Sequence, residues 1–299
     1  MRAGVVLGLV SMFPLLAAGA QAQSQAQTET RLIPYTGPYA YGLQIAPPWN
    51  DGGSLIINLP EHLEVWPSTW GILRYSDKAA PEARWQVSED GKTALLNAES
   101  LPLPATVPNV SVKGTAKVVG TDRVEITMRI ENKSDKELPG IRPLYCSQYR
   151  TLTGFPQWQE NFKHTYVLIG GKPVALADIP TEKADADVKA AYVRGATQRD
   201  SNDFARSRGG LIEDKELDAA IIAVESLDGS RRVLIAWTPG KSMLSNAAIP
   251  CAHGDPYYGP IPVGEAREAK GIVWFTEKPV AEAMTSLFKE AWGVPPKTQ

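Results

Sequence analysis

The stretch RVEITMRI at residues 123–130 shows the clearest secondary-structure pattern in the chain. Apolar and polar side chains alternate along it without a break. A period of two is typical of a β-strand with one buried face and one face in water. The polar turn NKSDK follows at 132–136, and an apolar stretch resumes at 141–149. These residues predict two strands joined by a turn.

Similar short patterns occur on both sides of this stretch. Two hairpins are predicted where Gly170-Gly171 and the tetrapeptide LDGS at 227–230 separate apolar segments, because glycine accepts the positive φ angles of tight turns. Helix signals are few. The best covers 280–292, and a weaker one covers 181–191. The other predicted strands are 54–59, 93–97, 110–119, 166–169, 174–176, 219–224, 232–237 and 271–276.

The many short strands and few helices, with 24 prolines and 25 glycines, predict an all-β fold. We expect a large antiparallel β-sandwich with a short C-terminal helix. Residues 32–299 are predicted to form a single domain. The alternative places a boundary between two domains in the proline-rich segment 101–108.

The N-terminal residues have the three-part pattern of a secretory signal. Arg2 supplies the positive charge, an apolar run covers 5–18, and small residues form cleavage patterns at 18–22. The run is shorter than the roughly 20 apolar residues of a membrane-spanning helix. We therefore expect residues 1–22 to be a cleaved signal peptide and 23–31 a disordered spacer. The mature chain is then expected in the periplasm or outside the cell, with no membrane span.

The charges are nearly balanced, with 31 Lys and Arg against 33 Asp and Glu. Nucleic-acid-binding proteins usually carry a basic surface, and anionic membranes attract basic segments. We therefore expect neither nucleic acid nor a membrane surface as a partner. The sequence leaves the oligomeric state open.

The chain has two cysteines, Cys146 and Cys251, both in the part expected to be exported. In an oxidising compartment, two such cysteines often pair. A disulfide and two free thiols are equally compatible with the sequence, because the sequence does not show whether the two Cα atoms lie close enough to bond.

The strand at 123–130, its polar turn and the following LPGIR at 138–142 together resemble the galactose-mutarotase-like supersandwich family. The resemblance covers about residues 110–155. This family includes sugar epimerases and domains of polysaccharide-degrading enzymes, so the resemblance implies a carbohydrate-processing β-sandwich. Its epimerases use a His and a Glu as acid and base, but no His occurs in the resembling segment. The resemblance therefore assigns these roles to no residue here.

The segment PCAHGDPYYGP at 250–260 is the strongest candidate for chemistry. If it is extended, Cys251, His253 and Asp255 lie on one side of the strand. We predict that His253 is a general base oriented by Asp255, and that Arg142 or Tyr257 stabilises developing negative charge.

The same three side chains, Cys251, His253 and Asp255, could also bind a metal. No compact group of further ligands appears in the sequence, so we expect no metal and no cofactor. In the alternative without function, Cys251 is buried or disulfide-bonded, and His253 and Asp255 only shape a loop.

Residues 142–164 are rich in aromatic side chains with Arg and Gln between them. Aromatic rings stack on the apolar faces of sugars, and the planar donors of Arg reach hydroxyls or carboxylates. We predict exposed rings in the loop 153–158, although ordinary core packing is the alternative. His164, at the start of a strand, is a further catalytic candidate. The predicted substrate-binding residues are Arg142, Tyr145, Tyr149, Trp158 and Tyr258.

Two functions from different classes are consistent with these patterns. The first is an exported enzyme that acts on a sugar or polysaccharide by His-based, lyase-like proton abstraction. Hydrolysis would need two carboxylates about 5–9 Å apart, and the sequence identifies no such pair. The second is a non-catalytic module of the cell envelope that binds glycans or proteins, and a structural envelope protein is a third reading. A deep pocket around His253 would favour the enzyme.

Overall fold

The computed structural model describes residues 29–49, 52–65, 70–74, 83–99, 109–197 and 203–293. The predicted signal peptide, most of the predicted spacer and the segment 101–108 lie outside the described residues. None of the helices in the described part combines the length and the hydropathy of a membrane-spanning helix.

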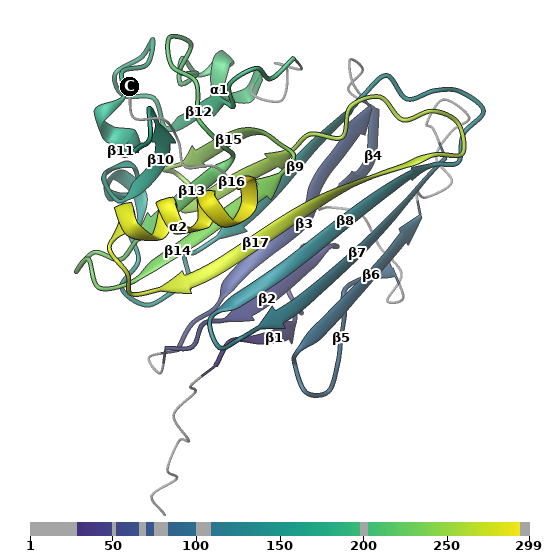
Figure 1. The fold of residues 1–299 in the computed structure, drawn as a ribbon, viewed down its shortest axis with the longest axis horizontal. Helices are drawn as coiled ribbons and strands as arrows, with labels where there is room; N and C mark the ends of the chain where they lie inside the picture. The colour runs from purple at the N-terminus through teal and green to yellow at the C-terminus, as the bar shows by residue number, and fades with distance from the viewer. Residues whose placement is uncertain are drawn as a thin grey trace, which may run out of the picture.

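Two antiparallel sheets make up the fold (Figure 1). Sheet A has eight strands, in the order β1-β2-β3-β9-β16-β15-β12, with β4 paired to β3. The all-β sandwich with a C-terminal helix is therefore confirmed. The strands of sheet A are β1 (Arg31–Pro34), β2 (Gly42–Ala46), β3 (Leu55–Val65), β4 (Trp70–Arg74), β9 (Ile141–Gln148), β12 (Val188–Tyr192), β15 (Gly240–Asn246) and β16 (Cys251–Pro256).

Sheet B has nine strands, in the order β11-β10-β13-β14-β17-β8-β7-β6-β5. The predicted strand at 123–130 is β8, whose side chains alternate between buried and more exposed positions as expected. The strands of sheet B are β5 (Gln86–Val87), β6 (Thr93–Glu99), β7 (Val110–Val119), β8 (Arg123–Asn132), β10 (Thr165–Ile169), β11 (Lys172–Ala175), β13 (Ile221–Glu225), β14 (Arg232–Thr238) and β17 (Ala266–Thr276).

The space between the sheets holds one hydrophobic core that runs from Leu32 to Phe275. Strands β6 and β7, which flank the segment 101–108, pair with each other along their length. That segment therefore connects neighbouring strands of one sheet.

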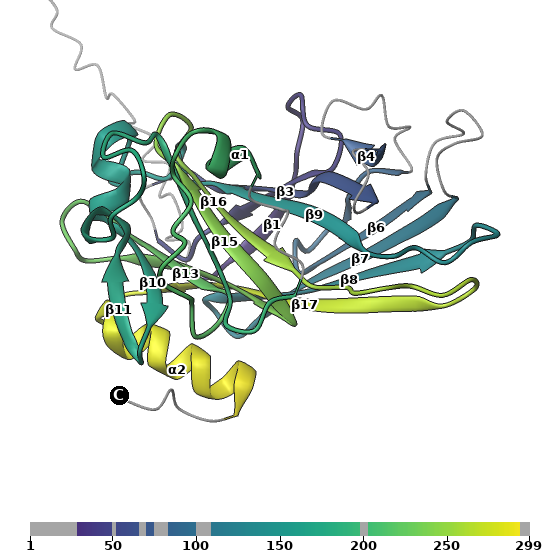
Figure 2. The ribbon, with the colours of Figure 1, turned by 90° about the horizontal axis from the view of Figure 1, so that it is seen from above.

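The C-terminal helix α2 (Val280–Trp292) covers the outer side of sheet B (Figures 1 and 2). Met284 and Leu287 are buried in a second apolar cluster, which also contains Leu234 of β14. The helix ends at Gly293, which adopts the left-handed conformation at φ 74°. The predicted C-terminal helix is thus confirmed at its predicted bounds.

The second predicted helix, at 181–191, is wrong. Residues Val188–Tyr192 form strand β12, and every residue in it is buried. Its outer side is covered by the short helix α1 (Asp203–Ser207), where Ala205 packs into a third apolar cluster. Because both sides of β12 are covered, its sequence lacks the alternation that marks a half-exposed strand.

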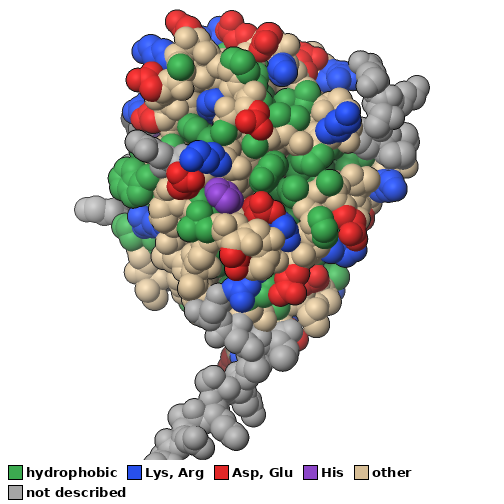
Figure 3. Space-filling view, turned by 90° about the vertical axis from the view of Figure 1, so that its left-hand side faces the viewer, with side chains coloured by type: hydrophobic (Ala, Val, Ile, Leu, Met, Phe, Trp, Pro, Cys, Tyr) green, Lys and Arg blue, Asp and Glu red, His purple; other side chains and the backbone are tan. Residues whose placement is uncertain are grey.

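The end of the molecule that carries β10 and β11 faces the viewer in Figure 3. Acidic and basic side chains are mixed over this face, around a central group of hydrophobic ones. Neither charge forms a continuous patch in this view.

Candidate functional site

Strands β9 and β16 lie side by side in sheet A and bring the two cysteines together. Cys146 is opposite His253 in the register of these strands, and Cys251 is opposite Gln148. The Sγ of Cys251 lies 3.6 Å from Nε2 of His253. One ligand atom from each of Cys146, Cys251 and His253 lies within 4.8 Å of the others, and all three residues are buried.

These side chains lie on the outer side of sheet A, away from sheet B. The residues between them show this: Ala252 belongs to the inter-sheet core, and a Cβ on Gly254 would meet the Trp237 ring of sheet B. Because successive strand residues point to opposite sides, Cys251 and His253 point outward. The alternation predicted for an extended 251–255 is therefore confirmed, since β16 is extended throughout.

Both cysteines are free thiols in the structure. The hydrogen bond with Cys251 and burial raise the pKa of the Cys146 thiol well above its usual range. The disulfide stays a prediction, although the two thiols are neighbours.

Glu61 reaches the cluster from β3, the strand on the other side of β9. The pairing of β3 with β9 shifts register between Asn58 and His62. Such bulges redirect side chains. The Oε2 of Glu61 lies 3.7 Å from Nε2 of His253, with the two side chains 21% and 10% exposed. The carboxylate beside the imidazole is therefore Glu61, which the sequence patterns did not single out.

Burial alone would lower the pKa of His253, but the neighbouring Cys146 sulfur and the carboxylates of Glu61 and Asp255 outweigh it. Together they raise the pKa of His253 to about 10. The role of general base stays a prediction for His253.

Asp255 is fully buried and is held by other partners. Its Oδ2 accepts a hydrogen bond from Ser242 Oγ at 3.0 Å, and its Oδ1 accepts one from the Tyr145 backbone N–H at 3.4 Å. Burial raises the pKa of the Asp255 carboxyl. Nδ1 of His253, which an orienting carboxylate would hold, is buried without a hydrogen-bond partner among the described residues. The influence of Asp255 on His253 is thus electrostatic, and the expected orienting hydrogen bond is not found in the described part.

Three of the predicted substrate-binding residues lie in the interior. The hydroxyls of Tyr145 and Tyr258 are 2.8 Å apart, and the Tyr145 ring packs edge-on against Trp237 with centroids 4.8 Å apart. Tyr149 donates a hydrogen bond to Asn161. Burial raises the pKa of all three tyrosines. The exposure expected of substrate-binding rings is therefore not found for Tyr145, Tyr149 or Tyr258, because each ring packs in the interior.

The remaining predicted residues are spread over the molecule. Trp158 is 63% exposed, as expected for the loop, whereas Phe155 is buried against Trp49. Tyr257 is partly exposed, with its hydroxyl 3.4 Å from Thr197 Oγ1. His164 lies between the 3₁₀ helix η2 (Trp158–Lys163) and β10, next to sheet B.

Arg142 is on β9, opposite Glu64 of β3. Its Nη1 lies 3.3 Å from Glu64 Oε2, and both side chains are partly exposed. Because Arg142 and Cys146 are four residues apart on one strand, their side chains point to the same side of sheet A. Arg142, one of the predicted substrate-binding residues, therefore lies on the same side of sheet A as Cys146, Cys251 and His253.

A separate cleft of about 360 Å³ lies beside α1. A smaller one of about 130 Å³ shares some of its residues. No predicted site residue lines either cleft. The larger cleft is lined by Pro180, Thr181, Glu182, Arg206, Leu211, Glu213 and Asp214.

No protein-family model and no curated protein matches the sequence. Among solved structures, a protein of Synechocystis sp. PCC 6803 is 12% identical, with 84% of this chain and 93% of that chain covered and a TM-score of 0.46. A galactose mutarotase related enzyme of Lactobacillus acidophilus is 8% identical, with coverages of 84% and 98% and a TM-score of 0.43. A polysaccharide lyase is 8% identical, with 88% of this chain but 34% of that longer chain covered and a TM-score of 0.41. Galactose-mutarotase-like proteins are thus among the structures that the chain resembles.

Proposed function

We propose that this chain is a carbohydrate-active protein that binds a sugar or polysaccharide on the outer side of sheet A, along β3 and β9. The observation that carries the proposal is a row of carboxylate and guanidinium groups, Glu61, Glu64 and Arg142, on two paired strands. Planar polar groups of this kind offer paired hydrogen bonds with fixed geometry. Vicinal hydroxyls of a sugar ring match such pairs.

Aromatic rings border the same side of the sheet. Gln148 of β9 donates a hydrogen bond through Nε2 to the Tyr39 hydroxyl at 3.0 Å. The ring of Tyr39 stacks on Tyr35 with centroids 5.5 Å apart and planes 10° apart, and both tyrosines are partly exposed. A stacked, partly exposed aromatic pair beside polar groups suits the apolar face of a sugar.

The scaffold supports this use of the surface. Side chains on strands with neighbours on both sides are held more precisely than side chains on loops. Both β3 and β9 have a neighbour on each side, and Figure 2 shows α1 on the outer side of sheet A.

The first test is electrophoresis of the full chain through gels that contain neutral or uronate polysaccharides, with ultraviolet absorbance and reducing ends followed in solution. We expect retardation by at least one polysaccharide, and much weaker retardation of Arg142→Ala. The matched control is Arg129→Ala, which removes an exposed arginine of sheet B whose Nη1 lies 3.7 Å from Glu268. Retardation that Arg142→Ala leaves unchanged, or none with any polysaccharide, would contradict the proposal.

The same assay tests the predicted lyase-like chemistry. Rising absorbance of an unsaturated uronate would extend the proposal from binding to elimination. Reducing ends without that absorbance would indicate hydrolysis. Export is proposed on the N-terminal pattern alone, and N-terminal sequencing of the mature chain tests it by showing cleavage near residue 22.

A further inference from the structure

We propose that Cys146, Cys251 and His253 bind a thiophilic transition-metal ion of the zinc class, with Glu61 as the fourth ligand. The inference does not depend on a carbohydrate role. It rests on the donor set, on the distances between donors and on an unpartnered polar side chain beside them.

The donor distances fit a tetrahedral ion. With Zn–S near 2.3 Å and Zn–N or Zn–O near 2.0–2.2 Å, neighbouring donors of a tetrahedral site are about 3.3–3.8 Å apart. The distance from Cys251 Sγ to His253 Nε2 is 3.6 Å, and the distance from His253 Nε2 to Glu61 Oε2 is 3.7 Å. The donor atoms of Cys146, Cys251 and His253 all lie within 4.8 Å of one another, so one ion can bind between these three, with Glu61 approaching from the side of His253.

The donors come from three consecutive strands of sheet A, β3, β9 and β16. Pairing of β9 with β16 fixes the backbones of Cys146, Cys251 and His253 whether or not an ion is bound, so these three ligands are preorganised. Two thiolates and one imidazole select zinc-class or copper(I)-class ions over calcium and magnesium, which prefer oxygen ligands. The two thiolates alone compensate the charge of a divalent cation.

Asn58 supplies an independent sign of a missing ligand. It is fully buried, and both its amide nitrogen and its amide oxygen lack a hydrogen-bond partner among the described residues. A buried polar group without a hydrogen-bond partner is destabilising. Asn58 lies opposite Cys146 in the register of β3 and β9, so its amide N–H is placed to donate to a metal-bound thiolate.

A disulfide between Cys146 and Cys251 would consume both sulfur ligands, so the metal site and the disulfide exclude each other. A metal on Nε2 also removes the lone pair that a general base would need. Metal binding therefore excludes both disulfide formation and general-base catalysis at Cys146, Cys251 and His253. A metal titration tests the first of these three.

The test is a titration of the full, reduced, chelator-treated chain with Co²⁺ under anaerobic conditions. We expect one Co²⁺ per chain, a thiolate-to-cobalt charge-transfer band and the intense visible bands of a tetrahedral site, all displaced by one equivalent of Zn²⁺. No such band in a chain with two titratable thiols would overturn the proposal. So would a mature chain that carries an intramolecular disulfide, shown by a mass two hydrogens lower.

Variants locate the site. Cys146→Ser and His253→Gln are expected to lower Zn²⁺ affinity by more than about 100-fold, since loss of even an outer partner costs about 10–100-fold. The control His62→Gln, on β3 outside the cluster, should leave affinity unchanged. Circular dichroism of each metal-free variant checks folding. Zn²⁺ affinity unchanged in Cys146→Ser would contradict the assignment, whereas sugar retardation tests the proposed function separately.

Discussion

His253 on β16 lies directly opposite Cys146 on β9, while the next residue, Gly254, faces the Trp237 ring across the core. The segment CAHGD at 251–255 is thus divided between two sides of one sheet. Its second and fourth residues pack toward sheet B, and its other three point outward. Packing of the inner side therefore fixes the position of the outer cluster.

Gly254→Ala should destabilise the fold. A Cβ at this position would lie 2.4 Å from Trp237 Cδ1 and 2.9 Å from Nε1, so the indole must move, at a cost of about 1–3 kcal/mol. Chemical denaturation measures the change. Trp237→Ala removes every atom that clashes, so Gly254→Ala should cost much less in that background than in the wild type. Simple additivity would contradict this account.

Asp255→Ala should be more damaging than Asp255→Asn. The buried carboxylate accepts hydrogen bonds from Ser242 Oγ and the Tyr145 N–H, and it interacts electrostatically with Lys241. Removing one partner of a buried charge pair typically costs about 3–5 kcal/mol. The amide in Asp255→Asn retains one acceptor oxygen, so the loss should be smaller. Equal unfolding free energies for the two variants would show that these hydrogen bonds contribute little.

The sequence predicts the half-exposed parts of the fold well. Strands β7 and β8 and helix α2 each bury one side, so their side-chain periods can be read directly. Strand β12 is buried on both sides and shows no period, which explains the wrong helix at 181–191. Strand β15 was not predicted for the same reason, since the five residues between its two terminal ones are all buried.

The candidate site is predictable only in part. The pattern at 251–255 identifies Cys251 and His253, but their neighbour Cys146 becomes visible only when β9 and β16 are paired. Glu61 lies where the register of β3 with β9 shifts, and this irregularity brings its carboxylate to 3.7 Å from Nε2 of His253. Long-range strand pairing and a local irregularity leave no signal in the spacing of residues.

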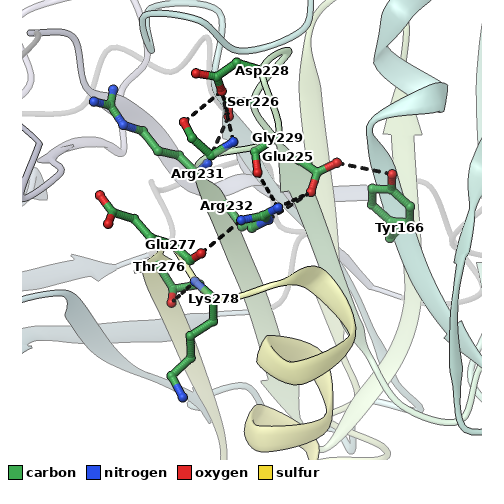
Figure 4. A network of polar contacts seen from close by, with 11 residues as sticks. Tyr166, Glu225, Ser226, Asp228, Gly229, Arg231, Arg232, Thr276, Glu277 and Lys278 are labelled. Atoms are coloured by element: carbon green, nitrogen blue, oxygen red, sulfur yellow. Dashed lines mark hydrogen bonds and ion pairs between the residues drawn. The ribbon is translucent and has the colours of Figure 1, made fainter.

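Arg232→Ala should lower the unfolding free energy by about 3 kcal/mol. Arg232 is opposite Glu225 on β13 and β14. Its Nε and Nη2 donate to Glu225 Oε1 at 2.9 and 2.6 Å (Figure 4), and both side chains are mostly buried. The control is Lys278→Ala, since Lys278 and Glu282 form an exposed pair expected to contribute below about 1 kcal/mol. If both variants lose a similar amount of unfolding free energy, burial does not determine how much each ion pair contributes.

Asp228→Ala should lower the melting temperature most at neutral pH. Asp228 Oδ1 accepts hydrogen bonds from Ser226 Oγ at 2.6 Å and from Ser230 N–H at 3.0 Å, as Figure 4 shows for Ser226. The Ser226 hydrogen bond, followed by those from Ser230, holds the pKa of Asp228 below its ordinary value of 3.8. A depressed folded-state pKa gives stability that is present above the unfolded value and lost as pH falls through the folded value.

The difference in melting temperature between wild type and Asp228→Ala should therefore shrink as the pH falls below about 4. The control is Asp135→Ala, at an exposed position in the turn after β8. A difference for Asp228→Ala that stays constant over this pH range would contradict the role of the charged carboxylate.

Trp158→Gly should stabilise the fold while weakening any sugar contact at this position. Trp158 has a φ of 51°, and the left-handed conformation costs a residue with a Cβ roughly 1–2 kcal/mol. Its side chain is 63% exposed, so its removal leaves little packing unmade. Thermal unfolding should show a higher melting temperature, and gel electrophoresis with polysaccharides should show weaker retardation. A lower melting temperature would show that the indole packs on the protein more than it strains the backbone.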